Sequence, residues 1–186
     1  MTTPIVSLHV PEGAGNPPRA TRRLPYTLGA DEAYTVQPIG VVHSSFVWRD
    51  EAPRQPGLGT DNSAAIVLKP GMQNTLQDLA GFTHLWVIAW FHRSRGWKPQ
   101  IVPPRDRVKR GLFATRAPDR PNPIGLSVVR ITDIFGCRID IADHDLLDGT
   151  PILDLKPYIP AYDARPEARG GWVDALVDPG PDHRYR

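Results

Sequence analysis

Proline is the residue type that most restricts how this chain can fold, since 21 of its 186 residues are proline. Each proline fixes its own φ angle, removes a backbone donor and restricts the residue before it. Such a chain disfavours long helices and favours short strands joined by stiff turns. One stiff segment, residues 116–123, is called the connector here; it holds Arg116, Pro118, Arg120, Pro121, Asn122 and Pro123. A stiff segment has little entropy left to lose, so the connector is suited to presenting side chains to a ligand.

Short apolar runs between turn residues predict six or seven strands and one short helix. The run 83–91 is nearly all apolar and predicts a buried strand. Apolar residues at helical spacing predict a helix over 73–80, with Gly81 as its C-cap. The other predicted strands are 36–46 with a possible bulge at Gly40, 64–68, 112–115, 124–131, 137–141 and 152–155. This pattern predicts a small antiparallel barrel or sandwich.

The composition predicts one globular domain with tails. We expect an arm over 1–34, a folded domain over 35–175 and a tail over 176–186. The only cysteine, Cys137, permits no intrachain disulfide, and the six histidines show no metal-ligand spacing, so no metal site is expected. We find no signal peptide and no apolar run of membrane-spanning length, and therefore expect a cytoplasmic protein without a membrane partner. No glycine-rich loop leads from a strand into a helix, which argues against a Rossmann-type cofactor site.

Positive charge is concentrated in residues 93–120, where nine arginines and lysines face two aspartates. The formal net charge of the whole chain is only +2. A polyanion such as RNA is the functional interpretation of this segment, and a solvated basic loop is the alternative. The candidate RNA-binding residues are Arg95, Arg105, Arg107, Lys109, Arg110 and Arg120.

Four clusters of polar residues stand where a predicted strand meets a loop, which is the usual place for function on a rigid scaffold. They are residues 53–57, residues 91–93, residues 114–116 with the connector, and residues 145–151. Each cluster also has a structural interpretation. Asp148-Gly149 is a common turn pair, and a lone histidine such as His92 is more often structural than catalytic.

In their order along the chain, these segments resemble the TrmO-type (TsaA-like) family of S-adenosylmethionine-dependent tRNA methyltransferases. The resemblance covers about residues 36–173. The matching stretches are Ile39-Gly-Val-Val-His-Ser, Pro53-Arg-Gln-Pro-Gly-Leu, Leu79-Ala-Gly-Phe-Thr-His-Leu-Trp, Phe91-His, 111–130 and 145–160. The connector and the Asp-Leu-Leu-Asp-Gly-Thr-Pro stretch at 145–151 are the most specific of these.

The resemblance implies a mainly β fold, namely a small single-sheeted antiparallel β-barrel with one or two short helices and long loops. It implies a homodimer that binds S-adenosyl-L-methionine and methylates N6 of N6-threonylcarbamoyladenosine, next to the anticodon of tRNA. The cofactor positions that it implies are Pro53, Arg54, Gln55, His92, Arg93, Arg116, Leu126, Asp148, Gly149, Thr150 and Pro151. Because N6 lies in a urea-like linkage, it is a poor nucleophile while protonated, and Asp148 is a candidate base; cofactor anchoring is its rival role.

The chain departs from the family pattern in three places. About 26 residues follow Pro160, where many bacterial members carry a C-terminal extension that helps to hold tRNA. An N-terminal arm with several arginines stands at the other end, and Arg-Ser-Arg follows His92, where relatives often place an acidic residue or asparagine. Two alternatives to the family activity therefore stay open: a non-catalytic RNA-binding barrel, and a methyltransferase that acts on another RNA or on a small molecule.

Overall fold

A computed structural model of the chain describes residues 35–58, 62–104 and 106–176. The predicted arm over 1–34 and residues 177–186 of the predicted tail lie outside this part. The chain divides into two compact units after Val36, and the second unit, Gln37–Arg186, contains all the helices and strands of the described residues.

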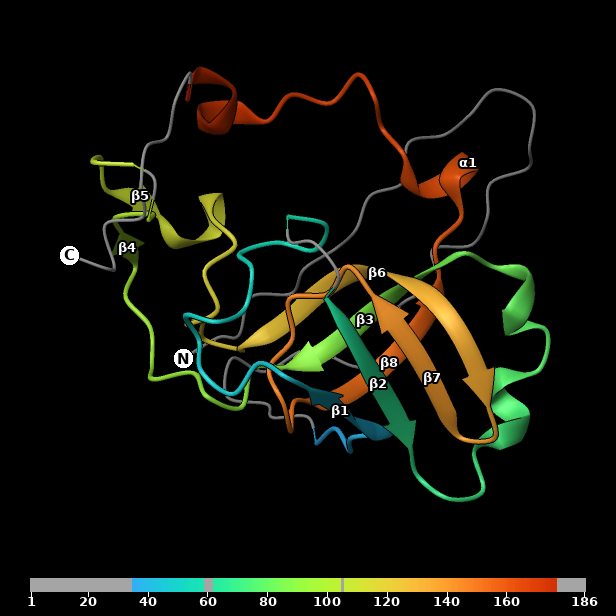
Figure 1. Cartoon of the computed structure of the whole chain (residues 1–186). Helices are drawn as coiled ribbons and strands as arrows, with labels where there is room; N and C mark the ends of the chain where they lie inside the picture. The colour runs from blue at the N-terminus through green and yellow to red at the C-terminus, as the bar shows by residue number, and fades with distance from the viewer. Residues whose placement is uncertain (1–34, 59–61, 105, 177–186) are drawn as a thin grey trace, which may run out of the picture. The chain divides into compact units, whose positions relative to one another are not determined.

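Six strands close into one antiparallel barrel (Figure 1). They are β1 (Gly40–Ser44), β2 (Ser63–Leu68), β3 (His84–Trp90), β6 (Ile124–Phe135), β7 (Arg138–Ala142) and β8 (Pro151–Pro157). The strands pair in the order β1-β2-β7-β6-β3-β8, and β8 pairs back with β1. The barrel confirms the mainly β class and decides between the two predicted architectures, because a sandwich would need two separate sheets.

The core fills the barrel interior, and the alternation of buried and half-buried residues is clearest in β3. In β3, Leu85, Val87 and Ala89 are fully buried, and the residues between them are half-buried. The predicted strand over 83–91 is therefore confirmed, but only one of its faces is fully buried. The other strands direct a further set of apolar side chains to the same interior: Val42, Ile66, Leu68, Val129, Ile139, Ile141 and Ile152.

Gly40 was predicted as a possible bulge, and this prediction is wrong. Gly40 pairs regularly with Leu68 on one side and with Ile152 on the other. A Cβ atom at this position would lie 2.5 Å from the carbonyl oxygen of Val67. The glycine is needed because two backbones approach each other closely, which is the other common reason for glycine within a strand.

The helix predicted over 73–80 is also wrong. Two 3₁₀ turns stand there instead, η1 (Gln73–Leu76) and η2 (Leu79–Gly81). Asp78 between them has a φ of 65°, in the left-handed region that a right-handed helix cannot contain. The apolar residues behind the prediction do pack against the core. Met72, Leu76 and Leu79 stand four and three residues apart, a spacing that two short 3₁₀ turns satisfy as well as an α-helix does.

The strand predicted over 112–115 is a third error, because η3 (Leu112–Ala114) is another 3₁₀ turn. Pairing stops one residue earlier, in a two-stranded ribbon of β4 (Gln100–Ile101) and β5 (Arg110–Gly111). The Thr115 hydroxyl donates to the Leu112 carbonyl at 2.7 Å and so closes the turn. Two short elements follow the barrel, α1 (Pro160–Asp163) and η4 (Gly171–Ala175).

The hairpin between the predicted strands over 124–131 and 137–141 is confirmed. Gly136, with a φ of 58°, turns β6 into β7. The strand β6 extends four residues beyond its predicted end, with an irregular register between Ile131 and Asp133.

Candidate functional site

The antiparallel register brings all four predicted clusters to one end of the barrel, which we call the site rim. The strands β1, β3 and β7 end at this rim, and β2, β6 and β8 begin there. Trp90 pairs with Ile124, and Val41 pairs with Pro151, so the loops next to these pairs lie together. Figure 1 shows the arrowhead of β3 beside the start of β6. Segments far apart in the sequence therefore meet at this rim.

Gln55 and Arg116 join the first cluster to the connector. Nη1 of Arg116 donates to Oε1 of Gln55 at 2.6 Å, and Nε2 of Gln55 donates to the carbonyl of Arg54 at 2.6 Å. The backbone N–H of Gly57 donates to the Asp143 carbonyl at 3.1 Å, which fastens the same loop to the β7–β8 loop. The structure thus brings the predicted residues Arg54, Gln55 and Arg116 together, and Pro53 precedes them as a half-buried residue.

Asp145 belongs to the fourth predicted cluster, but the sequence analysis assigned it no role of its own. The hydroxyl of Ser127, which is 2% exposed on β6, donates to Oδ1 of Asp145 at 2.6 Å. Burial raises the pKa of the Asp145 carboxyl, while the Ser127 hydrogen bond and the positive charge of Arg116 oppose that rise. Asp145 opens the Asp-Leu-Leu-Asp stretch, but the partner that holds its side chain lies in a different strand.

The segment from Asp148 to Pro151 is fastened along β1. Oδ1 of Asp148 accepts from the backbone N–H of Ser44 at 3.1 Å, and the Asp148 N–H donates to the Phe46 carbonyl at 2.8 Å. Gly149, with a φ of 74°, and the buried Thr150 continue these contacts before Pro151 begins β8. These four predicted residues therefore form one ordered edge of the rim.

His92 and Arg93 lie beside that edge. Nη1 of Arg93 donates to the Val47 carbonyl at 2.6 Å, and its guanidinium lies 5.9 Å from the ring centre of Trp48. Burial and the charge of Arg93 lower the pKa of His92, whereas the charge of Asp148 raises it. Trp48, 62% exposed, is a rim residue that the sequence analysis did not select.

Leu126 is the predicted cofactor residue that lies within a strand, near the start of β6. It alternates with the buried Gly125 and Ser127 in β6 and is 59% exposed. Its side chain therefore points away from the barrel interior, beside the exposed Ile124. A role for Leu126 in cofactor binding stays a prediction.

Hydrogen bonds hold the connector in place at two points, Asp119 and Pro123, in agreement with the stiffness that its prolines predict. Asp119 accepts from Nη2 of Arg49 at 3.2 Å and from the backbone N–H of Arg95 at 3.0 Å. Burial raises the pKa of this carboxyl, but these hydrogen bonds outweigh it and the pKa is lowered overall. The Phe91 N–H donates to the Pro123 carbonyl at 2.7 Å, so the connector is also fastened to the end of β3.

The candidate RNA-binding residues fall into two groups. Arg110 donates to Asp106 at 2.7 Å and lies 5.1 Å from the ring centre of Trp172, and Arg120 donates to the Thr115 carbonyl at 3.0 Å. These two arginines have structural partners, while the other described candidates are exposed: Arg95, Arg107 and Lys109. Arg105 lies outside the described residues.

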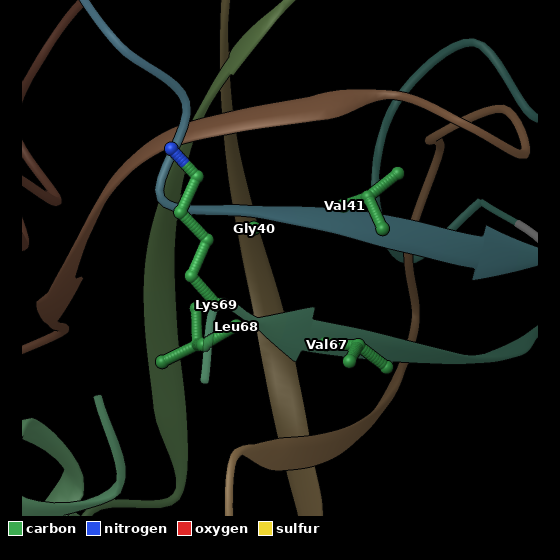
Figure 2. Close-up of a pocket in the computed structure, with 5 residues that line it drawn as sticks. All are labelled: Gly40, Val41, Val67, Leu68 and Lys69. Carbon is green, nitrogen blue, oxygen red and sulfur yellow. The ribbon is translucent and has the colours of Figure 1, made fainter. Parts of the chain in front are cut away.

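Two surface depressions are lined by residues other than the predicted site residues. One has a volume of about 320 Å³ and is lined by Gly40, Val41, Val67, Leu68 and Lys69, at the opposite end of β1 and β2. Figure 2 shows Val41 and Val67 on these neighbouring strands, with Lys69 just beyond β2. The other, of about 460 Å³, is lined by residues of β1, β2, β6 and β7, among them His43, whose Nδ1 lies 3.9 Å from Oδ1 of Asp148. The predicted site residues gather instead at the site rim, which is therefore the candidate functional site.

Within residues 35–58, 62–104 and 106–176, none of the helices is long and apolar enough to cross a bilayer. The same part of the chain contains no cluster of three or more histidine, cysteine or acidic side chains that is arranged to hold a metal ion.

Fold and rim together define a class: a closed six-stranded antiparallel barrel that gathers arginines, an amide and carboxylates on the loops at one end. A family model described as the tRNA-methyltransferase O N-terminal domain matches residues 41–164. The chain belongs to this family.

Relatives and solved structures agree with this assignment. A "Probable S-adenosyl-L-methionine-binding protein" of Pyrococcus abyssi is 41% identical over 141 residues, which cover 76% of this chain and 77% of that protein. A "tRNA (adenine(37)-N6)-methyltransferase" of Escherichia coli is 33% identical, covering 77% and 65%. The crystal structure of TrmO from Pseudomonas aeruginosa has a TM-score of 0.67 at 37% identity, covering 81% and 65%. The chain thus spans slightly less than two thirds of the latter two proteins.

Proposed function

We propose that this chain is an S-adenosyl-L-methionine-dependent methyltransferase that acts on N6 of N6-threonylcarbamoyladenosine in tRNA. The observation that carries the proposal is the meeting of the four clusters at one rim, where Arg116 reaches across to Gln55. Family membership and the activities for which the relatives are named support the same reaction class.

The side chains at the rim fit this cofactor by their chemistry. Arg116 offers a planar fork that suits the carboxylate of the methionyl part. The amide of Gln55 and the backbone of Gly149 and Thr150 offer polar groups for an adenine edge. Gly149 is exposed and lacks a Cβ atom, so a ring can approach its backbone closely. When bound, the cofactor supplies an electrophilic methyl group on a positively charged sulfur.

For Asp148, the two roles of base and cofactor anchor compete. Its Oδ1 already accepts a hydrogen bond from the Ser44 N–H, and its own N–H binds Phe46. These contacts favour the anchoring role, in which Asp148 holds the segment that carries Gly149 and Thr150 in place. Alignment of the methyl group with N6 then supplies much of the rate enhancement.

The basic segment and the rim supply contacts for tRNA. Arg107 and Lys109 are exposed and suit phosphate contacts, while the exposed ring of Trp48 suits stacking on a base. We further propose a homodimer and a cytoplasmic location, where its tRNA substrate is found. Sedimentation analysis of the full chain tests the dimer.

Total tRNA incubated with the protein and labelled cofactor, followed by nucleoside mass spectrometry, tests the function. We expect methylated threonylcarbamoyladenosine with the wild type and loss of more than about 90% of it with Arg116→Ala, since a charge-assisted bidentate contact is worth about 1.5–3 kcal/mol. Lys156→Ala, which removes an exposed partner of Asp154 on β8, is the matched control and is expected to retain full activity.

Three results would contradict parts of the proposal. Cofactor binding together with a different methylated nucleoside would favour another RNA substrate. Cofactor binding without any methylated RNA would favour a small-molecule substrate. No cofactor binding at millimolar concentration, with tRNA still bound, would favour a non-catalytic RNA-binding barrel.

A further inference from the structure

The rim carries two carboxylates, Asp145 and Asp148, in different surroundings. Asp148 is 46% exposed at its side chain and accepts a backbone hydrogen bond. Asp145 is held instead by the hydroxyl of Ser127, a residue 2% exposed inside the barrel wall. The proposed reaction needs a proton acceptor, because N6 loses a proton when it gains a methyl group.

We propose that the Asp145 carboxylate, fixed by the Ser127 hydroxyl at the site rim, accepts the proton that N6 of the substrate loses during methyl transfer. This inference deepens the proposed function and rests on it. The N6–H bond breaks and its proton passes to the Asp145 carboxylate. The electron pair of N6 forms the new bond to the methyl carbon, and the electrons of the carbon–sulfur bond return to sulfur, which leaves a neutral thioether. The carboxylic acid then returns its proton to solvent.

The geometry supports this role in two respects. Ser127 fixes Asp145 through a short hydrogen bond of 2.6 Å to Oδ1. Asp145 also stands in the β7–β8 loop between two contacts of the proposed cofactor site: the Asp143 carbonyl accepts from the Gly57 N–H at 3.1 Å, and Oδ1 of Asp148 accepts from the Ser44 N–H at 3.1 Å.

Burial also makes Asp145 a stronger base than an exposed aspartate. Burial raises its pKa above the ordinary value, which brings a carboxylate closer to the neutral range where a general base works best. Among the described residues, the charged group that acts on it is Arg116 in the connector, and β6 contributes the neutral Ser127. Its chain neighbour His144 is fully buried in the core.

The test uses the full chain with tRNA, under single-turnover conditions with saturating cofactor, as a function of pH. For Asp145→Asn, which keeps the shape and can still accept from Ser127, we expect a rate lower by about 10²–10⁴-fold. Cofactor affinity by calorimetry is expected to stay within about threefold of the wild type. Asp148→Asn is the matched comparison and is expected to retain the acid limb of the pH–rate profile.

Ser127→Ala provides a second, independent arm. Because the Ser127 hydroxyl stabilises the charged carboxylate, its removal raises the pKa of Asp145. The base must be deprotonated to work, so the acid limb of the rate profile shifts to higher pH while the rate at the alkaline plateau is retained. Carbon-detected NMR titration of the aspartate carboxyls, without cofactor, is expected to show the same upward shift at Asp145.

Each remaining outcome overturns the inference. An Asp145→Asn rate within about threefold of the wild type, or a rate loss fully explained by lost cofactor affinity, refutes the base role alone. The base role is also refuted if Asp148→Asn abolishes the acid limb of the pH–rate profile. It is refuted as well if Ser127→Ala leaves the acid limb at the wild-type pH. A wild-type protein that binds the cofactor but does not methylate threonylcarbamoyladenosine in tRNA refutes the proposed function and this inference with it.

Discussion

Gly125 links the packing of the barrel to the conformation of the site rim. It points into the barrel interior, opposite Ala89. A Cβ atom at this position would lie 2.5 Å from Cε1 of Phe91 and closer still to its Cζ. The Phe91 ring therefore packs directly over the glycine, and Phe91 is followed by the predicted cofactor residues His92 and Arg93. Gly125→Ala should disturb both stability and the site.

The magnitude follows from the kind of atom that is met. The Phe91 ring is part of a side chain and can rotate, but its backbone is fastened to Pro123. Overpacking of this kind costs about 1–3 kcal/mol. For a chain of this length, 1 kcal/mol lowers Tm by about 2–4 °C. If about 1.4 kcal/mol of the strain is carried into the bound state of the site, cofactor affinity falls about tenfold.

Thermal unfolding and calorimetric titration with the cofactor measure the two effects. Gly111→Ala is the matched control, because Gly111 has a φ of −57° and no atom lies within 4 Å of the position that an added Cβ atom would take there. We expect the control to change the free energy of unfolding by less than about 0.5 kcal/mol.

A double mutant isolates the contact itself. Shortening the ring with Phe91→Leu makes room for the added methyl group, so Gly125→Ala in that background should cost less than in the wild type. The expected coupling energy is about 0.5–3 kcal/mol. Additive effects, or a Gly125→Ala protein as stable as the wild type, would refute the argument that Phe91 packs against Gly125.

Two further predictions concern pH and salt. Burial lowers the pKa of His144, so below about pH 6.5 the unfolded chain binds a proton that the folded protein does not. Tm should therefore fall as the pH drops from about 7.5 to 5.5. A Tm that stays constant over this range would contradict the burial of a neutral His144. His144→Asn keeps an acceptor for the Leu146 N–H and should reduce that fall. Arg107→Ala combined with Lys109→Ala should lower the slope of log K for tRNA against log salt by about two, measured by filter binding, whereas an unchanged slope would exclude both as phosphate contacts.

The barrel strands could be predicted because their signal is local. In β3 the apolar run identified the strand, and alternate residues fill the core. The helix over 73–80 was not predictable in the same way, because the apolar spacing fits two kinds of helical turn and only the left-handed Asp78 separates them. The strand over 112–115 failed for a related reason. Leu112 is 3% exposed and its neighbour Phe113 is 79% exposed, and residue type alone does not distinguish the two.

The four clusters at the rim could be identified from the sequence, but their proximity to one another depends on how the barrel strands pair. The contact between Gln55 and Arg116 spans 61 positions of the chain, so no local pattern contains it. Asp145 lay in a predicted cluster but received no role, because the partner that distinguishes it from Asp148 is Ser127 in β6, far away in the sequence. Its neighbours in the chain, Leu146 and Leu147, carry no sign of this role.

The two arginines of the connector show why residue counts overstate a binding surface. Arg120 turns back on its own segment, donates to the carbonyls of Thr115 and Ala117, and lies 5.4 Å from the ring centre of Phe113. It therefore stiffens the connector beside Arg116, which reaches outward to Gln55. Some arginines and lysines of residues 93–120 therefore hold the loop in place, while others are exposed for contact with a ligand. Because a phosphate contact requires an exposed cation, tRNA affinity should depend more on Arg107 and Lys109 than on Arg120.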